Sequence, residues 1–134
     1  MVQNPGNDDG VVSISSPFAF AETVQRLLAA FLAHAIKVFA TIDQQAEAAA
    51  VDLAMPPTTI IFFGNPKAGT PLMLAQPRSG IDLPLKVLVR ESVPGTVLVE
   101  FNSPQYLVQR HGLPADLVAN LAPARALIEQ TLRP

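Results

Sequence analysis

Two stretches of the chain repeat apolar residues at the spacing of an α-helix. In residues 24–35 these positions lie three or four apart and share one helix face, which predicts an amphipathic helix. They are Val24, Leu27, Leu28, Phe31, Leu32 and Ala35. In residues 117–132, Pro123 would clash with the carbonyl four residues before it, so two helices or a break are expected there. The shared apolar face comprises Leu117, Leu121, Ala124, Ile128 and Leu132.

Three segments in the first half of the chain are predicted strands. Residues 11–15 are short, residues 37–42 alternate in the manner of a strand, and residues 58–63 are largely apolar. A strand that is apolar on both faces is typical of an interior position in a sheet, with cover on both sides. Between the second and third strands, Asp43 is expected to cap a short alanine-rich helix over residues 44–51.

Residues 85–91 and 96–101 are predicted to form a β-hairpin. Pro94 and Gly95 match the second and third positions of a type II turn, whose third position needs a positive φ. One face is apolar and is expected to belong to the core: Val87, Val89, Val97, Val99 and Phe101. The other face is mixed, and its leucines suggest cover from a helix or a second subunit. Its members are Lys86, Leu88, Arg90, Leu98 and Glu100.

The order of these elements predicts an α+β fold. Ser103 and Pro104 begin a further helix that Gly112 ends, so helices follow the last strand. The expected architecture is a single, mostly antiparallel sheet of about five strands with helices packed on it. The order is strand, helix, four strands and C-terminal helices. We expect one domain over residues 10–134 and a flexible leader over residues 1–9.

Composition and charge exclude several classes of protein. Of the 134 residues, 49% are hydrophobic and 15% are charged, which excludes a disordered chain. There is no cysteine, so disulfides, thiolate nucleophiles and zinc fingers are excluded. The net charge of −2 gives no electrostatic footprint for nucleic acid. Residues 61–112 are mildly basic, however, and this suits a small anionic ligand better than a long polyanion.

No segment has the pattern of a membrane span or a signal peptide. The apolar run within the first predicted helix, residues 27–33, is much shorter than the roughly 20 residues that cross a bilayer. Residues 1–10 are polar and acidic. We therefore expect a cytoplasmic protein that does not contact a membrane.

The polar loop that follows residue 63 is the first candidate site. Gly64, Gly69 and Thr70 nearly spell a phosphate-binding P-loop. The lysine that should precede Thr70 is missing, and Pro71 removes an amide where the helix should offer one. We therefore reject a nucleotide site in this loop.

A weaker anion site in the same loop is still consistent with the residues. Thr70 is expected to cap a helix that Pro71 opens, with its free amides directed toward Lys67. This arrangement would suit a carboxylate or a phosphate. Under the alternative interpretation, Asn65 ties a simple turn with its side chain and Lys67 is solvated.

A second polar cluster lies after the hairpin. It consists of Asn102, Ser103, Tyr106, Arg110 and His111. Tyr106 and Arg110 are four residues apart and share a helix face, whereas His111 lies at the helix end. Under the alternative interpretation, His111 is simply a capping or surface residue.

The histidines are the only candidates for acid–base chemistry or metal binding that the pattern offers. A general base at His111 would need a carboxylate beside it, and Asp82 and Asp43 are the plausible ones. His34 and His111 have no paired spacing, so we expect no metal site and no cofactor.

Three motifs carry a resemblance to a known family. They are the loop from Phe63 to Met73, the segment from Ile81 to Val89, and the stretch from Asn102 to Leu113. Residues 23–27 and 38–43 also match in order and spacing. On these motifs, over residues 10–130, the chain closely resembles the domain-of-unknown-function family 302.

The resemblance implies a small α+β fold with an antiparallel-rich sheet, packed helices and a homodimer. It implies no activity, because the family is named for lacking one. Members often have histidine after the aspartate that matches Asp43, where this chain has Gln44. They usually have aspartate where this chain has Ser103. Both departures count against catalysis.

Our leading hypothesis is a domain that binds a small, anionic ligand as a homodimer, with Lys67 and Arg110 pairing the anion. The candidate site comprises Asn65, Lys67, Thr70, Asp82, Lys86, Asn102, Tyr106, Arg110 and His111. One alternative is an enzyme that uses His111 as general base with Asp82 or Asp43. Another is a structural or assembly protein without a ligand.

Overall fold

The structure of the protein is a computed structural model that describes residues 9–134. Within that range, five strands form one sheet in the order β1-β5-β4-β3-β2, with every neighbouring pair antiparallel. The strands are β1 (Val11–Ser15), β2 (Lys37–Asp43), β3 (Thr58–Gly64), β4 (Leu85–Val93) and β5 (Thr96–Asn102). The predicted α+β fold is confirmed. Apart from Asp9, the predicted leader lies outside the described residues.

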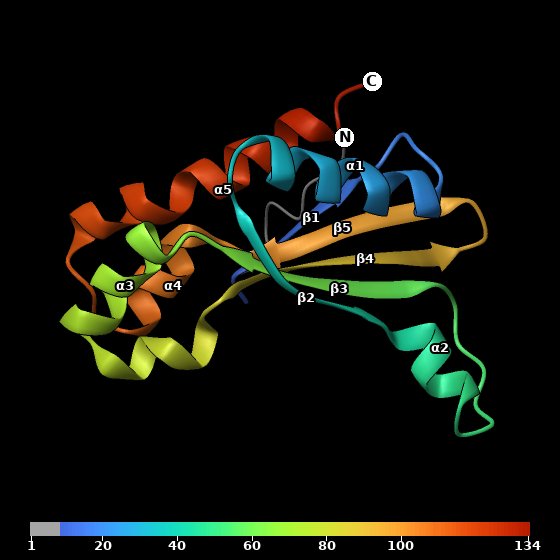
Figure 1. The fold of residues 1–134 in the computed structure, drawn as a ribbon, viewed down its shortest axis with the longest axis horizontal. Coiled ribbons are helices and arrows are strands. Elements are labelled where there is room, and N and C mark those ends of the chain that lie inside the picture. Colours follow the sequence, from blue (N-terminus) through green and yellow to red (C-terminus); the bar gives the residue numbers. More distant parts are fainter. Residues whose placement is uncertain (1–8) are drawn as a thin grey trace.

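The helices are distributed unevenly around the sheet (Figure 1). They are α1 (Phe20–Ala33), α2 (Gln44–Ala49), α3 (Pro66–Ala75), α4 (Pro104–Arg110) and α5 (Val118–Thr131), with 3-10 helices η1 (Pro77–Asp82) and η2 (Ala115–Leu117). The longest two, α1 and α5, lie on one face of the sheet, while α3 and α4 gather at one end and α2 lies at the other (Figure 1). Within residues 9–134 no helix combines the length and apolar character that crossing a membrane requires.

The main core lies between α1, α5 and one face of the sheet. The hairpin positions predicted for the core are all buried: Val87, Val89, Val97, Val99 and Phe101. Phe31 of α1 stacks on Phe63 of β3, with ring centroids 4.3 Å apart. In the β4–β5 turn Gly95 has a φ of +85°, as predicted.

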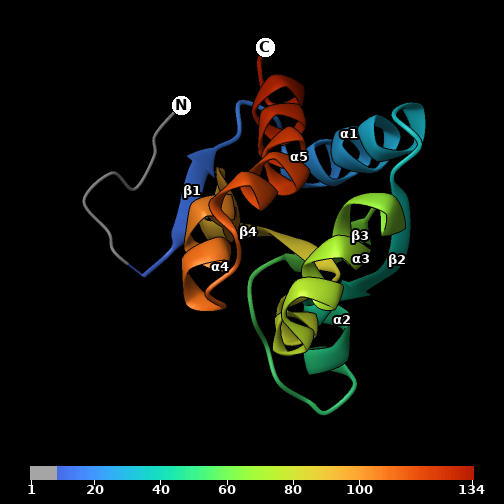
Figure 2. The ribbon, with the colours of Figure 1, turned by 90° about the vertical axis from the view of Figure 1, so that its left-hand side faces the viewer.

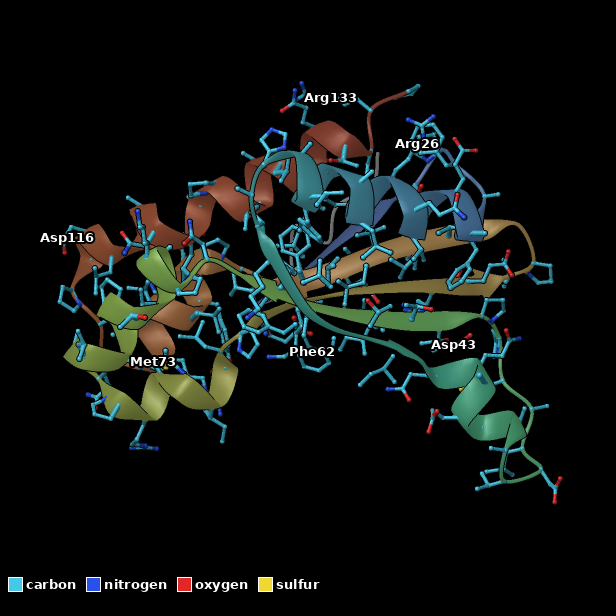
Figure 3. All side chains as sticks on the ribbon, viewed as in Figure 1. Arg26, Asp43, Phe62, Met73, Asp116 and Arg133 are labelled. Carbon is cyan, nitrogen blue, oxygen red and sulfur yellow. The ribbon has the colours of Figure 1, made fainter. Side chains whose placement is uncertain are left out.

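The predicted interior position of β3 is confirmed, but helices cover only one of its faces. Thr59, Ile61 and Phe63 are buried, whereas Ile60 and Phe62 are only half-buried. Phe62 lies on the side of the sheet away from α1 and α5 (Figure 3). This second face is called the open face below.

The buried face of α1 differs from the predicted one at Leu32, which is 82% exposed. The stripe that packs on the sheet comprises Thr23, Leu27 and Phe31. Thr23 can lie in this stripe because its hydroxyl hydrogen-bonds to the carbonyl of Ala19 and to the hydroxyl of Ser16, at 2.9 and 2.7 Å. An apolar repeat alone could not identify a polar residue as part of the core.

Two predictions that rested on proline are wrong. The helix expected to begin at Thr70 begins at Pro66 with Asn65 as its cap, and Pro71 lies inside it. The break expected at Pro123 is absent, because α5 continues through it. A proline inside a helix costs about 3 kcal/mol. In α5, buried Leu121 and Ile128 anchor the helix on both sides of Pro123 and offset that cost.

Gly10 allows close contact between β1 and α4. It has a φ of +84°, and a Cβ added there would lie 2.2 Å from Cγ of Tyr106. Its carbonyl accepts a hydrogen bond from the amide of Ser103, the residue that caps α4, at 2.7 Å. Tyr106 therefore helps to hold α4 against the sheet.

We expect Gly10→Ala to lower the free energy of unfolding by about 2 kcal/mol or more, since alanine is strained at this φ and its methyl group overlaps the Tyr106 ring. Gly69→Ala is the matched control, because Gly69 lies in α3 and nothing lies within 4 Å of the added Cβ. This control should raise stability by about 0.5–1 kcal/mol. Urea denaturation measures both, and equal effects of the two changes would contradict the contact.

Candidate functional site

The C-terminal end of α4 places Arg110 and His111 beside one another. The helix begins as predicted, because the hydroxyl of Ser103 accepts a hydrogen bond from the amide of Tyr106 at 3.4 Å. It ends before Gly112, which has a φ of +60°. Leu107 and Val108 are buried and anchor the helix, which fixes the backbone that carries Arg110 and His111.

Asp82 reaches this end of α4 from the 3-10 helix η1. Its Oδ2 lies 2.6 Å from Nε2 of His111 and 3.0 Å from Nη1 of Arg110. Its Oδ1 lies 3.2 Å from the same Nη1. The His111 and Asp82 side chains are only 7% and 14% exposed. One carboxylate therefore bridges a guanidinium group and a nearly buried imidazole.

The contact with Asp82 orients the His111 ring. A carboxylate accepts hydrogen bonds, so Nε2 of His111 carries a proton and donates a hydrogen bond to Oδ2 of Asp82. In the neutral ring, Nδ1 is then left as an acceptor. Of the two carboxylates considered from the sequence, Asp82 is the partner. Asp43 caps α2 at the other end of the molecule, where it accepts from the amide of Ala46 (Figure 1).

A cavity of about 330 Å³ lies beside this cluster. Its lining comprises Pro77, Arg78, Ile81, Arg110 and His111. Arg78 adds a second guanidinium group, so two arginines and one histidine are set against the single carboxylate of Asp82. Sequence reasoning counted Arg78 only in the overall charge, since nothing local distinguishes it from a solvated surface arginine.

The other predicted site residues separate into different places. Asn65 and Thr70 line a larger cavity of about 550 Å³. Lys86 and Asn102 line a cavity of only about 20 Å³, together with Asp82. This smallest space has room for about one water molecule.

Neither Lys67 nor Tyr106 lines any of these three cavities. The amide of Lys67 donates to Oδ1 of Asn65 at 3.0 Å and so belongs to the start of α3. In the part of the chain that the structure describes, no group of three or more His, Asp or Glu side chains is arranged to hold a metal ion.

Family comparison agrees with this arrangement of elements. Residues 12–132 match the model of a family described as "Domain of unknown function DUF302". The chain belongs to this family. A crystal structure of an uncharacterized conserved DUF302 protein from Bacillus stearothermophilus superposes with a TM-score of 0.81. The superposition covers 93% of this chain and 99% of that one at 20% identity, so it shows a common DUF302 fold.

Curated relatives match this chain over part of their own length. Over 106 residues, or 79% of its length, this chain is 40% identical to "Fluoride-specific ion channel FluC 1" of Brucella suis biovar 1 (strain 1330). The identity is also 40% to "Fluoride-specific ion channel FluC 2" of Brucella melitensis biotype 1 (strain ATCC 23456 / CCUG 17765 / NCTC 10094 / 16M). The matched region covers 42% and 39% of these relatives. The chain thus spans about two fifths of their length.

The two histidines are expected to adopt opposite neutral tautomers. His111 should carry its proton on Nε2 because of Asp82, whereas Nδ1 of His34 lies 2.9 Å from the carbonyl of Ala30 and should carry the proton there. Imidazole ¹⁵N chemical shifts at a pH where both rings are neutral measure this difference. Asp82→Asn should change the shifts of His111 and leave those of His34 unaltered. A neutral His111 protonated on Nδ1 would contradict the assigned geometry.

Proposed function

We propose that this DUF302 domain binds a small anion in the cavity beside Asp82, Arg110 and His111. The observation that carries the proposal is the second guanidinium group, that of Arg78, on the lining of the same cavity. Guanidinium groups present several N–H donors in a plane and suit the oxygens of carboxylates and phosphates. In this proposal Arg78 takes the place that the sequence suggested for Lys67.

The charges of the cluster support an anion rather than a cation. Asp82 balances one of the two arginines, so the cavity retains an excess positive charge even with His111 neutral. Asp82 also holds Arg110 in a fixed direction, and this lowers the entropy that the side chain would lose on binding. The volume of about 330 Å³ is at the small end of the range for ligand pockets.

A panel of small anions tests this proposal. Phosphate, sulfate, acetate and fluoride are added as sodium salts at constant ionic strength, and fluoride is included because of the names of the Brucella relatives. At least one should raise the melting temperature in a saturable manner. Arg78→Ala should weaken its apparent affinity about tenfold or more, since a charge-assisted hydrogen bond is lost.

Arg26→Ala is the matched control for that experiment. Arg26 pairs with Glu22 on α1 at 2.8 Å, at the other end of the molecule from α3 and α4 (Figure 3). This change should leave the anion effect intact. If no anion stabilises the protein, or if both arginine variants lose the effect equally, anion binding is rejected and the polar cluster is left with a structural function.

The contact between His111 and Asp82 favours one second candidate, an enzyme with His111 as general base. A carboxylate on Nε2 orients the imidazole and leaves Nδ1 to accept a proton from a substrate, which is the arrangement general-base catalysis needs. The tautomer measurement on His111 also bears on this candidate. A neutral ring protonated on Nδ1 would have its acceptor, Nε2, turned toward Asp82 and away from a substrate.

We also propose that the domain forms a homodimer through its open face. Apolar side chains lie next to one another across three strands, since Ile42 pairs with Ile60 and Ile60 pairs with Leu88. Two charged residues on this face pair with one another, with Nε of Arg90 2.6 Å from Oε1 of Glu100. The hydrogen bond from Arg90 lowers the pKa of the Glu100 carboxyl. A face with apolar neighbours and a neutralised ion pair is suited to contact with a second copy.

Light scattering at micromolar concentration should therefore report a dimer for the unmodified protein. Leu88→Lys should shift it to a monomer, because an unpaired ammonium group would be buried in the interface. Leu74→Lys is the control, since Leu74 is 79% exposed on α3 and lies away from the open face. Melting curves of both variants verify that they fold. A monomeric unmodified protein would contradict the interface.

A further inference from the structure

The largest cavity described here has a chemistry different from that of the anion site. It has a volume of about 550 Å³ and lies where the end of α1, the start of α3 and the first half of α5 meet one end of the sheet. Figure 2 views the molecule from this end and shows α1, α3 and α5 there. We propose that this cavity binds an uncharged, mainly apolar small molecule that carries one hydrogen-bonding group.

The lining of the cavity selects against charged ligands. It contains no aspartate, glutamate, lysine or arginine among the described residues. Most of the wall is apolar, as exemplified by Ile36, Phe39, Phe63, Met73, Leu121 and Leu127. The titratable side chain among the described lining residues, His34, has its Nδ1 on the carbonyl of Ala30, and the ammonium of Lys37 lies over the ring of Phe39, outside the lining. An ionic group among the apolar side chains would therefore lose hydration with little compensation, which is unfavourable. Apolar surface, by contrast, gains free energy by leaving water, in proportion to the area buried.

Two large apolar side chains of this wall are incompletely covered by the protein itself. Phe39 is 46% exposed and Met73 is 38% exposed, although both line the cavity. Phe39 lies at a shift in the register between β2 and β3, since Val38 pairs with Phe63 and Ala40 with Phe62. A bulge of this kind turns a side chain out of the regular alternation. An apolar ligand would cover these exposed surfaces.

The polar groups in the lining support one hydrogen-bonding end on the ligand. The Nδ2 of Asn120 donates a hydrogen bond to the carbonyl of Ala68 at 3.0 Å, which leaves the Oδ1 of Asn120 as an acceptor. The Oδ1 of Asn65 accepts a hydrogen bond from the amide of Lys67, which leaves the Nδ2 of Asn65 as a donor. Both residues line the cavity. A hydroxyl or amide group on the ligand could meet one of them, as in many apolar pockets with a few polar groups.

The shape of the cavity favours a small molecule over a protein partner. Its volume lies within the range of about 300–1,000 Å³ typical of ligand sites. The hydrogen bond between Asn120 and Ala68 ties α5 to α3, so two of its walls are joined across their interface. A partner protein would instead need a broad, contiguous surface of about 800 Å². The apolar residues here line a hollow.

Fluorescence titration with the uncharged probe N-phenyl-1-naphthylamine tests the proposal. The intact domain should bind the probe saturably, and 1-decanol should displace it at least about tenfold more effectively than decanoate, because the carboxylate is not accommodated. Arg78→Ala should leave probe binding unchanged, since Arg78 does not line this cavity. Failure of the anion site and failure of the apolar site are thereby distinguished.

Two neighbouring residues of α3 provide matched variants. Met73→Lys places a charge on the cavity lining and should weaken probe binding about tenfold or more. Leu74→Lys places the same charge one residue further on, where the side chain is 79% exposed and outside the lining, and should have no effect. Both positions are accessible to solvent, so both variants are expected to fold, which melting curves verify.

Four outcomes would overturn the proposal. Three are no saturable binding of the probe, equal weakening by the two lysine variants, and displacement by decanoate as readily as by decanol. The fourth is probe binding that falls as assembly increases with protein concentration, because this would assign the apolar surface to a second copy of the chain.

Discussion

The structure depends on the apolar contact between two helices and one face of the sheet. Phe31 and Phe63 stack at the centre of this contact, and the valines of β4 and β5 continue it toward β1. Because the C-terminal half of α5 is held there by Ile128 and Leu132, its first half extends beyond the strands. That extension meets α3 and α4, where Leu121 joins a second apolar cluster with Leu72 and Leu107. The positions of the three cavities described above follow from this geometry.

The end of the sheet so formed contains two kinds of chemistry. On the side of η1 and α4, a carboxylate is shared by Arg110 and His111, and Arg78 adds positive charge. On the side of α3 and α5, the wall is mainly apolar and contains no aspartate, glutamate, lysine or arginine among the described residues. Segregation of this kind is favourable, since charged groups keep their hydration near water while apolar surface gains free energy by leaving it. A ligand with an anionic group and a separate apolar ligand would thus be recognised independently.

The open face adds a different constraint. Sheets covered on one side usually place polar residues on the other, yet Ile60, Phe62 and Leu88 are only half-buried here. The Arg90–Glu100 pair neutralises the charge among them. At the edge of the sheet, every residue of β2 is exposed. The uneven placement of the helices therefore leaves both a face and an edge for contact with other molecules.

The sequence by itself determined the local structure of this protein. Helical and strand periodicities, the turn at Gly95, the caps at Asp43 and Ser103 and the apolar face of the hairpin all act over a few residues, and the resemblance to the family extended them to a fold. Only the tertiary structure decided that Asp82 meets His111, that Arg78 joins them and that Asn65 and Thr70 line another cavity. It also decided that α5 passes through Pro123, because packing offsets a lost hydrogen bond. Contacts between residues distant in the chain depend on how the helices pack on the sheet, and no local pattern encodes that packing.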